Sequence, residues 1–283
     1  MKYFGGIPID NLTMETAEVI LQPIPYDGTS TWGKGADKGF LAFMEAADNM
    51  ELYDIETKSE VYKTGIYVNE VWNDFSSPED MFSAVYERTK DLINSHKFLT
   101  FFGGEHSVSI GIIKALREKH KGLNVLHLDA HADLRSSYLG SNYNHACALH
   151  DASRHCNLVQ VGIRSMDSSE LDYINDDQVF YAKDIIEDNE WMDASIALLE
   201  DPVFITLDLD VLDPSIMPST GTPEPGGLEW YQLLRYLRKV FNSKQVIGFD
   251  IVELAPIEGL RAPNFLAAKL YYKMLSYKFF PDE

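Results

Sequence analysis

The chain has 283 residues, of which 45% are hydrophobic, 24% are charged and two are cysteines. Its 24 Lys and Arg residues against 44 Asp and Glu residues give a formal net charge of −20 at pH 7. This composition excludes disordered, collagenous and disulfide-stapled proteins. Such an acidic surface repels nucleic acid and anionic membranes and favours small cationic partners. The sequence has no apolar run near the ~18 residues of a membrane span. Its two cysteines, Cys147 and Cys156, cannot make a disulfide framework, so we expect a protein of the reducing cytoplasm.

Eight short runs of apolar, β-branched and aromatic residues predict β-strands. In chain order they cover residues 18–22, 65–68, 98–102, 124–128, 158–162, 178–181, 203–207 and 245–249. Several of them, such as 203–207, are apolar almost throughout, which is typical of parallel strands that are covered on both faces. We therefore expect a mostly parallel sheet.

Helices are predicted between these strands. One begins after Ser77, where a serine N-cap, a proline in the first turn and two acidic residues favour a helix start. The other predicted helices cover about 107–122, 227–240 and 260–277. Alternating strands and helices predict a doubly wound α/β sheet, in which ligands bind outside the carboxyl ends of the strands. The sequence shows no internal repeat or linker, so we expect one domain over residues 1–283, with the Pro- and Gly-rich stretch 211–227 as a functional loop.

Acidic and imidazole side chains follow three of the predicted strands. The segments Gly-Gly-Glu-His-Ser, Asp-Ala-His-Ala-Asp and Asp-Leu-Asp begin at residues 103, 129 and 208. Residues two apart in an extended chain point to the same side, so each segment can direct its acids or histidines to one point. Four carboxylates gathered there would repel one another, and two divalent cations would cancel their charges. The candidate metal ligands are His106, Asp129, His131, Asp133, Asp208 and Asp210.

This set of ligands favours a particular kind of metal. It is rich in oxygen, contains some imidazole and has no thiolate, which suits Mn²⁺ better than structural Zn²⁺, with Zn, Co and Fe as alternatives. Taken alone, an Asp-x-Asp pair is usually a turn or a helix cap, and a histidine in an apolar strand, such as His127, is usually a core residue. Cys147, two residues from His145, is expected to be a buried apolar cysteine rather than a nucleophile. The joint occurrence at three strand ends favours a pair of metal ions.

The sequence resembles the ureohydrolase family of arginases and agmatinases, and most closely the agmatinase branch. The resemblance is carried by the three segments above, by Pro-Tyr-Asp at 25–27, by Gly-Ile-Arg-Ser at 162–165, by the run from 208 to 227 and by Asp-Ile-Val-Glu at 250–253. It implies a three-layer α/β/α fold of the arginase type, with a mostly parallel sheet of about eight strands. It also implies two Mn²⁺ ions per subunit and a homo-oligomer, either a trimer or a hexamer.

The resemblance also implies a role for each site residue. One ion would be held by His106, Asp129, Asp133 and Asp208, and the other by Asp129, His131, Asp208 and Asp210. Asp133 would also accept a hydrogen bond from the attacking hydroxide, and His145 would carry protons. Glu253 would pair with the guanidinium of the substrate, with the Thr222 hydroxyl nearby.

These roles suit the hydrolysis of a guanidinium group. Its carbon is a poor electrophile, so the reaction needs hydroxide, which metal binding supplies at neutral pH by lowering the pKa of water to about 7. A carboxylate such as Glu253 can hold the planar guanidinium by a bidentate pair. The departing amine needs a proton, which a histidine with an ordinary pKa of about 6.5 can supply.

The preferred substrate is agmatine, which would be hydrolysed to putrescine and urea. Arginine is less favoured, because Arg135 stands where arginases have an asparagine that reads the α-amino acid end of the substrate. His150 and Asp151 stand where many agmatinases have two arginines. Arg164, expected in a structural ion pair, would favour an acidic substrate if it faced the pocket. The alternatives are guanidinobutyrate, guanidinopropionate, arginine or formimidoylglutamate hydrolysis, or a non-catalytic metal- or polyamine-binding protein.

Overall fold

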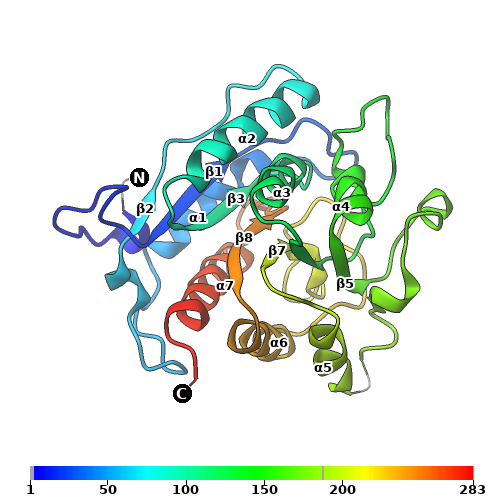
Figure 1. The fold of residues 1–283 in the computed structure, drawn as a ribbon. Helices are drawn as coiled ribbons and strands as arrows, with labels where there is room; N and C mark the ends of the chain where they lie inside the picture. Colours follow the sequence, from blue (N-terminus) through cyan, green and yellow to red (C-terminus); the bar gives the residue numbers. More distant parts are fainter. Residues whose placement is uncertain (1–2, 187, 283) are drawn as a thin grey trace.

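The computed structural model describes residues 3–186 and 188–282 (Figure 1). Its centre is one sheet of eight described strands, all paired in parallel, in the order β2-β1-β3-β8-β7-β4-β5-β6. The strands are β1 Val19–Ile24, β2 Ile66–Val68, β3 Phe98–Gly103, β4 Asn124–Leu128, β5 Asn157–Ile163, β6 Val179–Tyr181, β7 Val203–Asp208 and β8 Val246–Val252. All eight predicted strands are therefore confirmed, and only their ends differ from the prediction.

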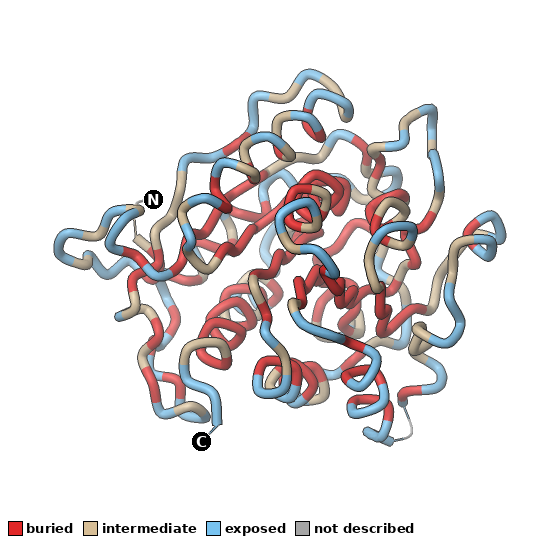
Figure 2. Tube along the Cα trace, in the orientation of Figure 1, coloured by how far each residue is buried: buried red, intermediate tan, exposed pale blue. Residues whose placement is uncertain are grey.

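α-Helices cover both faces of this sheet (Figure 1). They are α1 Gly39–Ala47, α2 Pro78–Ile93, α3 Val108–Lys119, α4 His150–His155, α5 Glu190–Ala197, α6 Trp230–Ser243 and α7 Ala262–Phe279. The first layer contains α2, α3 and α4, and the second contains α1, α7, α6 and α5. Each layer encloses its own hydrophobic core against the sheet, and Figure 2 shows buried residues following the strands through the middle of the molecule. The expected three-layer α/β/α fold is confirmed.

The start of a helix and its length both affect whether the sequence predicts it. At the start of α2 the Ser77 hydroxyl accepts a hydrogen bond from the N–H of Asp80 at 3.1 Å, and Pro78 occupies the first turn, as predicted. The helices α1, α4 and α5 are not predicted from the sequence. These are the three shortest α-helices of the described chain, with nine, six and eight residues. Short helices give little periodic signal in the sequence, and their stability depends on packing against neighbouring elements.

The start of α6 differs from the prediction by three residues. The helix begins at Trp230 and not at Gly227. Gly227 and Leu228 instead run beside the segment that follows β7, and the N–H of Leu228 donates to the carbonyl of Val211 at 2.9 Å. A Cβ atom on Gly227 would lie only 2.5 Å from the nitrogen of Asp213. This glycine therefore permits the close approach of two segments instead of starting a helix.

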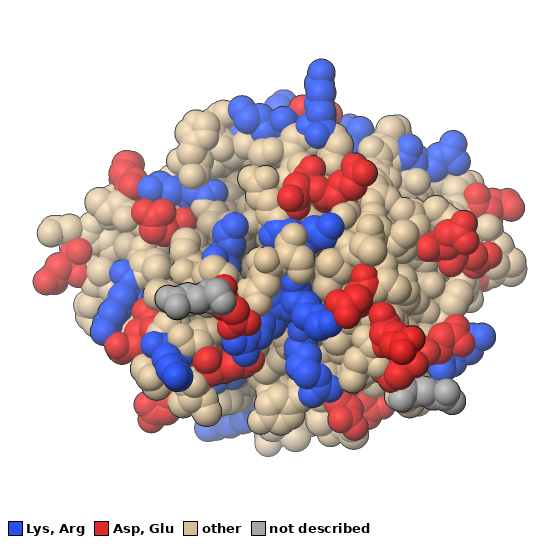
Figure 3. All heavy atoms as spheres, turned by 60° about the horizontal axis from the view of Figure 1, so that its bottom comes forward, with Lys and Arg blue, Asp and Glu red and all other residues tan. Residues whose placement is uncertain are grey.

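The charged residues are spread unevenly over the surface. On the face in Figure 3, Lys and Arg side chains gather near the centre and Asp and Glu side chains lie around them. The net charge of −20 therefore does not form a uniform acidic coat. Within the described residues, none of the helices combines the length and the apolar character that crossing a membrane requires.

Candidate metal centre and active site

The candidate site lies where four neighbouring strands end. The strands β3, β8, β7 and β4 are adjacent in the middle of the sheet. At or just beyond their carboxyl ends lie His106, Glu253, Asp208 and Asp129, in that order. Because all four strands run parallel, these segments meet at one edge of the sheet although they are far apart in the sequence. This is the location that the sequence predicts.

The His106 ring faces a group of carboxylates. Its Nδ1 atom lies 3.0, 3.2 and 3.5 Å from the Oδ2 atoms of Asp129, Asp133 and Asp208. The ring and all three carboxylates are buried. An imidazole nitrogen and three carboxylate oxygens thus converge on one small volume, which is the arrangement expected of metal ligands.

A buried chain of polar groups fixes the tautomer of His106. Its Nε2 atom lies 2.9 Å from the Thr206 hydroxyl, which donates toward Ser109, and Ser109 donates to Asp250 at 2.8 Å. The Thr206 oxygen therefore accepts from the Nε2–H group, and Nδ1 presents its lone pair to the carboxylates. Within the described residues this buried Nδ1 atom has no hydrogen-bond partner. A free lone pair aimed at carboxylates is what a metal ion requires of a histidine ligand.

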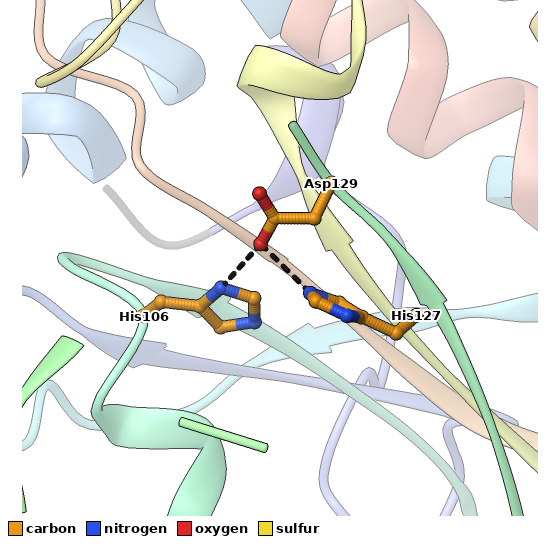
Figure 4. Close-up of side chains that lie close together, drawn as sticks. All are labelled: His106, His127 and Asp129. Carbon is orange, nitrogen blue, oxygen red and sulfur yellow. Dashed lines mark hydrogen bonds and ion pairs between the residues drawn. The ribbon is translucent and has the colours of Figure 1, made fainter. Parts of the chain in front are cut away.

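A second buried histidine, His127, holds Asp129 from the other side (Figure 4). The Gln160 side chain donates to His127 Nδ1 at 2.9 Å, so the His127 Nε2–H group donates to Asp129 Oδ2 at 2.7 Å. The N–H of His131 donates to the other oxygen of Asp129 at 2.5 Å. The prediction that His127 is a satisfied core residue is confirmed, since its ring is fully buried and both nitrogens have partners. The structure adds that this ring orients a candidate ligand.

His131 and Asp210 form the other half of the cluster. His131 Nδ1 lies 2.9 Å from Asp210 Oδ2 and 3.6 Å from Asp129 Oδ1. The backbone orients Asp210, because the N–H of Ala130 donates to its carboxylate at 3.0 Å. The N–H of Asp210 in turn donates to Asp208 at 2.8 Å. The structure therefore brings all six predicted ligands together, in two overlapping groups.

Two of the site carboxylates lie on backbone in the left-handed region. The φ angle is 54° at Asp133 and 67° at Glu253, a conformation that costs a residue with a Cβ about 1–3 kcal/mol. The N–H of Glu253 donates to the carbonyl of Gly104, and its Oε1 atom accepts from the N–H of His106, both at 2.8 Å. Gly104 has no room for a side chain, since a Cβ would lie 1.9 Å from the carbonyl oxygen of Tyr26. Strain and crowding thus concentrate at this site, as they do at many functional sites.

The carboxylates of the cluster cannot all be ionised without added positive charge. Burial and the charge of Asp129 raise the pKa of Asp133 to about 7. Burial and neighbouring acids raise the pKa of Asp208 well above its usual range, and burial with the charge of Glu105 does the same to the pKa of Glu253. At Asp129 burial acts in the same direction, but the adjacent imidazoles outweigh it and hold the pKa well below its usual range. Two divalent cations would remove this conflict, so the residues present fit a binuclear metal centre.

The cluster opens into a cavity of about 230 Å³. The predicted site residues that line this cavity are His131, Asp133, His145, Asp208, Thr222 and Glu253. The part of its lining formed by Arg135, Tyr138, Asp167 and Glu170 contains none of the predicted site residues and is termed the far wall. The predicted catalytic and substrate-binding residues are therefore in one place, next to the candidate metal ligands.

The guanidinium of Arg135, the one Lys or Arg side chain of the far wall, already has partners within that wall. The Arg135 guanidinium lies 4.4 Å from the centre of the Tyr138 ring and 3.6 Å from Asp167. Glu170 is buried and accepts the backbone N–H groups of Leu134 and Asp167 at 2.7 and 2.6 Å. With two carboxylates and one guanidinium, this wall has a net negative charge.

The contacts of Arg164 differ from the prediction. Within the described residues, Arg164 does not form the expected ion pair. Its guanidinium donates to the main-chain carbonyl groups of Gly162, Asp210 and Glu224. Spacing in the sequence does not reveal such acceptors, and Arg164 is not part of the cavity wall.

Cys147 is buried as expected, and burial raises the pKa of its thiol to about 12.

His150 and Asp151, which stand where many agmatinases have two arginines, also lie outside the cavity wall. His150 Nδ1 lies 2.9 Å from the carbonyl oxygen of Leu134, and Asp151 pairs with Arg117 at 3.1 Å. These contacts connect α4 to the segment after Asp133 and to α3. The two residues therefore stabilise the position of the segment after Asp133 and do not contact the cavity.

The sequence analysis does not identify several residues that the structure places near the site. They include Thr29, Glu105, Tyr138, Asp167 and Glu170. Thr29 and Glu105 had a usable signal, because each lies within or beside a segment that carries the family resemblance. Tyr138 lies in a loop whose course depends on tertiary contacts, and no local pattern marks it. Asp167 and Glu170 form a capping box, and their spacing is a local signal that the sequence analysis does not use.

Comparison with known proteins identifies the family. The Arginase family matches residues 17–276. The chain is 36% identical over 272 residues to the N(1)-aminopropylagmatine ureohydrolase of Synechocystis sp., and this match covers 92% of the chain and 89% of that protein. It is 30% identical over 277 residues to the agmatinase of Pyrococcus horikoshii, and this match covers 94% of each protein. The crystal structure of the agmatine ureohydrolase of Thermoplasma volcanium matches with a TM-score of 0.85 and 27% identity, over 94% of this chain and 91% of that one. The chain therefore belongs to the arginase family, whose members hydrolyse C–N bonds of guanidino groups.

Proposed function

We propose that the protein is a ureohydrolase of the agmatinase type, and that it hydrolyses agmatine to putrescine and urea. The observation that carries this proposal is the buried Nδ1 atom of His106, which faces three carboxylates beside a cavity lined by Glu253 and His145. The relatives support the same type of reaction, since they are named for agmatine and N(1)-aminopropylagmatine. A cytoplasmic location and a trimer or hexamer remain predictions from the sequence and the resemblance.

We assign the metal ligands as the sequence predicts. One ion would be held by His106, Asp129, Asp133 and Asp208, and the other by Asp129, His131, Asp208 and Asp210. A donor set of carboxylate oxygen and imidazole nitrogen supports Mn²⁺ as the metal. When bound, two such cations lower the pKa of water to about 7 and so supply a nucleophile at neutral pH.

Glu253 is placed to hold the guanidinium of the substrate. Its Oε1 atom is occupied by the N–H of His106 at 2.8 Å, whereas Oε2 lies near Gly221, where an added Cβ would be 3.4 Å away. The missing side chain at Gly221 leaves this side of the carboxylate open. A charge-assisted pair from the guanidinium to Glu253, with the Thr222 hydroxyl as a further acceptor, would direct the reacting carbon toward the metal ligands.

His145 is placed to move a proton, although it does not begin in its charged form. Burial lowers its pKa to about 4, with the charge of His131 adding to the effect. The ring is therefore neutral at pH 7, in contrast to the ordinary pKa that the sequence analysis assumes. A neutral imidazole must first accept a proton from the attacking water before it can donate one to the leaving amine. We therefore assign His145 as a base first and an acid second.

The far wall of the cavity supports a substrate with a cationic tail. Arg135 is engaged by Tyr138 and Asp167, and Asp167 and Glu170 leave the wall with a net negative charge. The amine of agmatine is attracted by such a wall, whereas the carboxylate of guanidinobutyrate or of a related acid is repelled. Arginine also carries a carboxylate, and the one guanidinium on this wall already has a partner. These contacts favour agmatine over the acidic substrates.

N(1)-aminopropylagmatine is a second candidate substrate. The Synechocystis relative, 36% identical over most of its length, is named for this compound. The aminopropyl group of this compound adds a second amine to the tail of agmatine. Two partly exposed carboxylates near the cavity could bind that amine: Asp167 on the far wall, and Glu224, which lies 3.9 Å from His131 Nε2. The cavity therefore offers a partner for a longer polyamine tail as well.

Urea release from a panel of guanidino compounds with added Mn²⁺ tests the proposal. The panel contains agmatine, N(1)-aminopropylagmatine, guanidinobutyrate, guanidinopropionate, arginine and formimidoylglutamate, with formamide assayed for the last. We expect release from agmatine or its aminopropyl derivative and little from the acids. Preference for an acid would overturn the assignment of the tail, and the absence of product from every compound would favour a non-catalytic binding protein.

A further inference from the structure

We infer that Thr29 and Glu105 are positioning residues that keep the proton of neutral His145 on Nδ1 and leave Nε2 free to exchange protons in the cavity. The inference rests on the proposed function, because the position of this proton matters for turnover only if His145 carries protons. The three residues come from three parts of the chain: the segment after β1, the turn between β3 and α3, and the loop before α4.

The Thr29 hydroxyl is the centre of this arrangement. Its Oγ1 atom lies 2.9 Å from Glu105 Oε1 and 3.2 Å from His145 Nδ1, and it accepts the N–H of His145 at 2.9 Å. Glu105 is fully buried and is fixed by the backbone. Its Oε1 atom also accepts the N–H of Thr29 at 3.2 Å, and its Oε2 atom accepts the N–H of Ser107 at 2.9 Å. Both oxygens of Glu105 are therefore used as acceptors.

The direction of these bonds determines the tautomer of His145. A hydroxyl has one proton, and Thr29 donates it to Glu105 Oε1, which also accepts the N–H of Thr29. The lone pairs of Thr29 Oγ1 then face His145, so the ring nitrogen at 3.2 Å must be the donor. A neutral imidazole carries one ring proton. With that proton on Nδ1, Nε2 has a lone pair, and the structure gives this atom no hydrogen-bond partner within the described residues.

The backbone around these groups keeps the arrangement rigid. The N–H of Glu105 donates to the carbonyl of Tyr26 at 2.8 Å, which joins the turn after β3 to the segment that carries Thr29. On the other side the Asn144 side chain accepts the N–H of Ala146 at 3.1 Å and caps the short turn that contains His145. Without the Thr29 hydroxyl, nothing in this network would favour the Nδ1–H form over the Nε2–H form. The second form turns the lone pair away from the cavity and cannot accept the first proton.

Two variants of Thr29 test the inference. Thr29→Val removes the hydroxyl at nearly constant volume, and Thr29→Ser retains it. With the enzyme loaded with Mn²⁺, we expect Thr29→Val to lower kcat for agmatine by about 10- to 100-fold, the usual effect of losing a partner that orients a site residue. The KM and the metal content should stay within about twofold of wild type. Thr29→Ser should restore most of kcat. Thr29→Ala provides a second hydroxyl-free variant if the valine disturbs folding.

The ring proton itself gives a readout that does not depend on activity. In protein labelled with ¹⁵N in the histidine rings and loaded with diamagnetic Zn²⁺, the signals of His145 are assigned by their absence from His145→Ala. We expect the Nδ1–H form in wild type and Thr29→Ser, and a mixture or the Nε2–H form in Thr29→Val. The inference is overturned if Thr29→Val retains the wild-type tautomer, or if Thr29→Ser is as slow as Thr29→Val. A wild-type enzyme that releases no urea would refute the proposed function, and the tautomer measurement would still decide the positioning.

Discussion

Two clusters of charged side chains in this molecule are built in opposite ways. In the first, the ammonium of Lys273 on α7 lies 2.9 Å from Asp54 and 2.7 Å from Glu56, and Arg238 pairs with Glu56 at 2.6 Å. In the second, at the carboxyl ends of the strands, four aspartates lie beside imidazole rings. Within the described residues, neither these aspartates nor Glu253 forms an ion pair with a Lys or Arg side chain. Within the described chain, Lys and Arg side chains balance the carboxylates of the first cluster, whereas the carboxylates of the second cluster have no such partners.

The pKa values of the carboxyl groups shift in opposite directions in the two clusters. Burial alone would raise the pKa of Asp54 and Glu56, but hydrogen bonds from Lys273 and from nearby groups outweigh it and lower both values. At the strand ends, burial and like charges raise the pKa of Asp133 and Asp208. Carboxylates that are paired with Lys and Arg side chains are part of the structural framework. Buried carboxylates without such partners are kept together by the surrounding structure, and their shifted pKa values indicate a functional site. This criterion identifies the site without reference to any motif.

Replacement of Asp208 by Ala is expected to have the largest effect on turnover. The change removes a carboxylate from the centre of the second cluster, so metal content should fall. The kcat for agmatine should drop by more than the roughly 100-fold that the loss of an orienting partner costs. Removal of a buried like charge should leave the metal-free protein at least as stable as metal-free wild type. Urea release, metal analysis and the thermal midpoint of the metal-free proteins measure these three effects.

Asp193→Ala is a matched control for this experiment, because Asp193 is an exposed aspartate that pairs with Lys239. Loss of such a surface pair changes stability by about 0–1 kcal/mol and should leave metal content and turnover unchanged. An Asp208→Ala protein with full activity and two bound ions would contradict the assignment of Asp208 as a shared ligand.

His145→Ala is expected to have the next largest effect. Loss of a general acid–base group lowers turnover by about 10²- to 10⁴-fold, and we expect kcat to fall in this range. Metal content should remain as in wild type, because none of the candidate ligands bonds to this ring in the structure. If the variant lost its metal instead, His145 would have to be counted among the ligands.

Asp167→Asn is expected to have a smaller effect that depends on the substrate. The change keeps the shape of the side chain and removes one of the two negative charges of the far wall. We expect the KM for agmatine to rise only about 5-fold, because solvent weakens an ion pair to an exposed carboxylate. The KM for n-butylguanidine, which lacks the distal amine, should not change. Asp172→Asn, at an exposed position five residues away, is the control, and an equal effect on both substrates would argue against contact with the tail.

The sequence predicts the sheet, and it places the six candidate ligands beyond strand ends that the structure brings together, for a physical reason. Apolar runs such as residues 203–207 mark parallel strands, and side chains two residues apart share one side of an extended chain. Both signals are local. The far wall and the Lys273 cluster depend instead on contacts between distant residues. Lys273 and Asp54, for example, are 219 positions apart. No pattern within a short window of sequence can report such a contact, so a single sequence does not reveal these parts of the structure.

Lys273→Met should have the smallest effect on turnover, since Lys273 is not part of the cavity wall, but a clear effect on stability. Removal of one partner from a buried ion pair costs about 3–5 kcal/mol, and we expect the free energy of unfolding to fall by about 3 kcal/mol at pH 7. Lys269→Met is the matched control. Lys269 is on the same helix, is only partly buried, and donates to a main-chain carbonyl. Chemical denaturation of both variants and of wild type measures the difference.

The pH dependence of this difference separates charge from packing. In wild type the folded-state pKa values of Asp54 and Glu56 lie below their unfolded values of about 4. Their contribution to stability is therefore present above pH ~4 and is lost as the pH falls through the folded-state values. In Lys273→Met the buried Asp54 loses its ammonium partner, so burial raises its pKa and protonation relieves the cost of an unpaired charge. The stability gap between variant and wild type should then narrow between pH 7 and pH 3. A gap that stays constant over this range would mean that Lys273 stabilises the fold by the packing of its aliphatic chain, and that the first cluster is not held by charge.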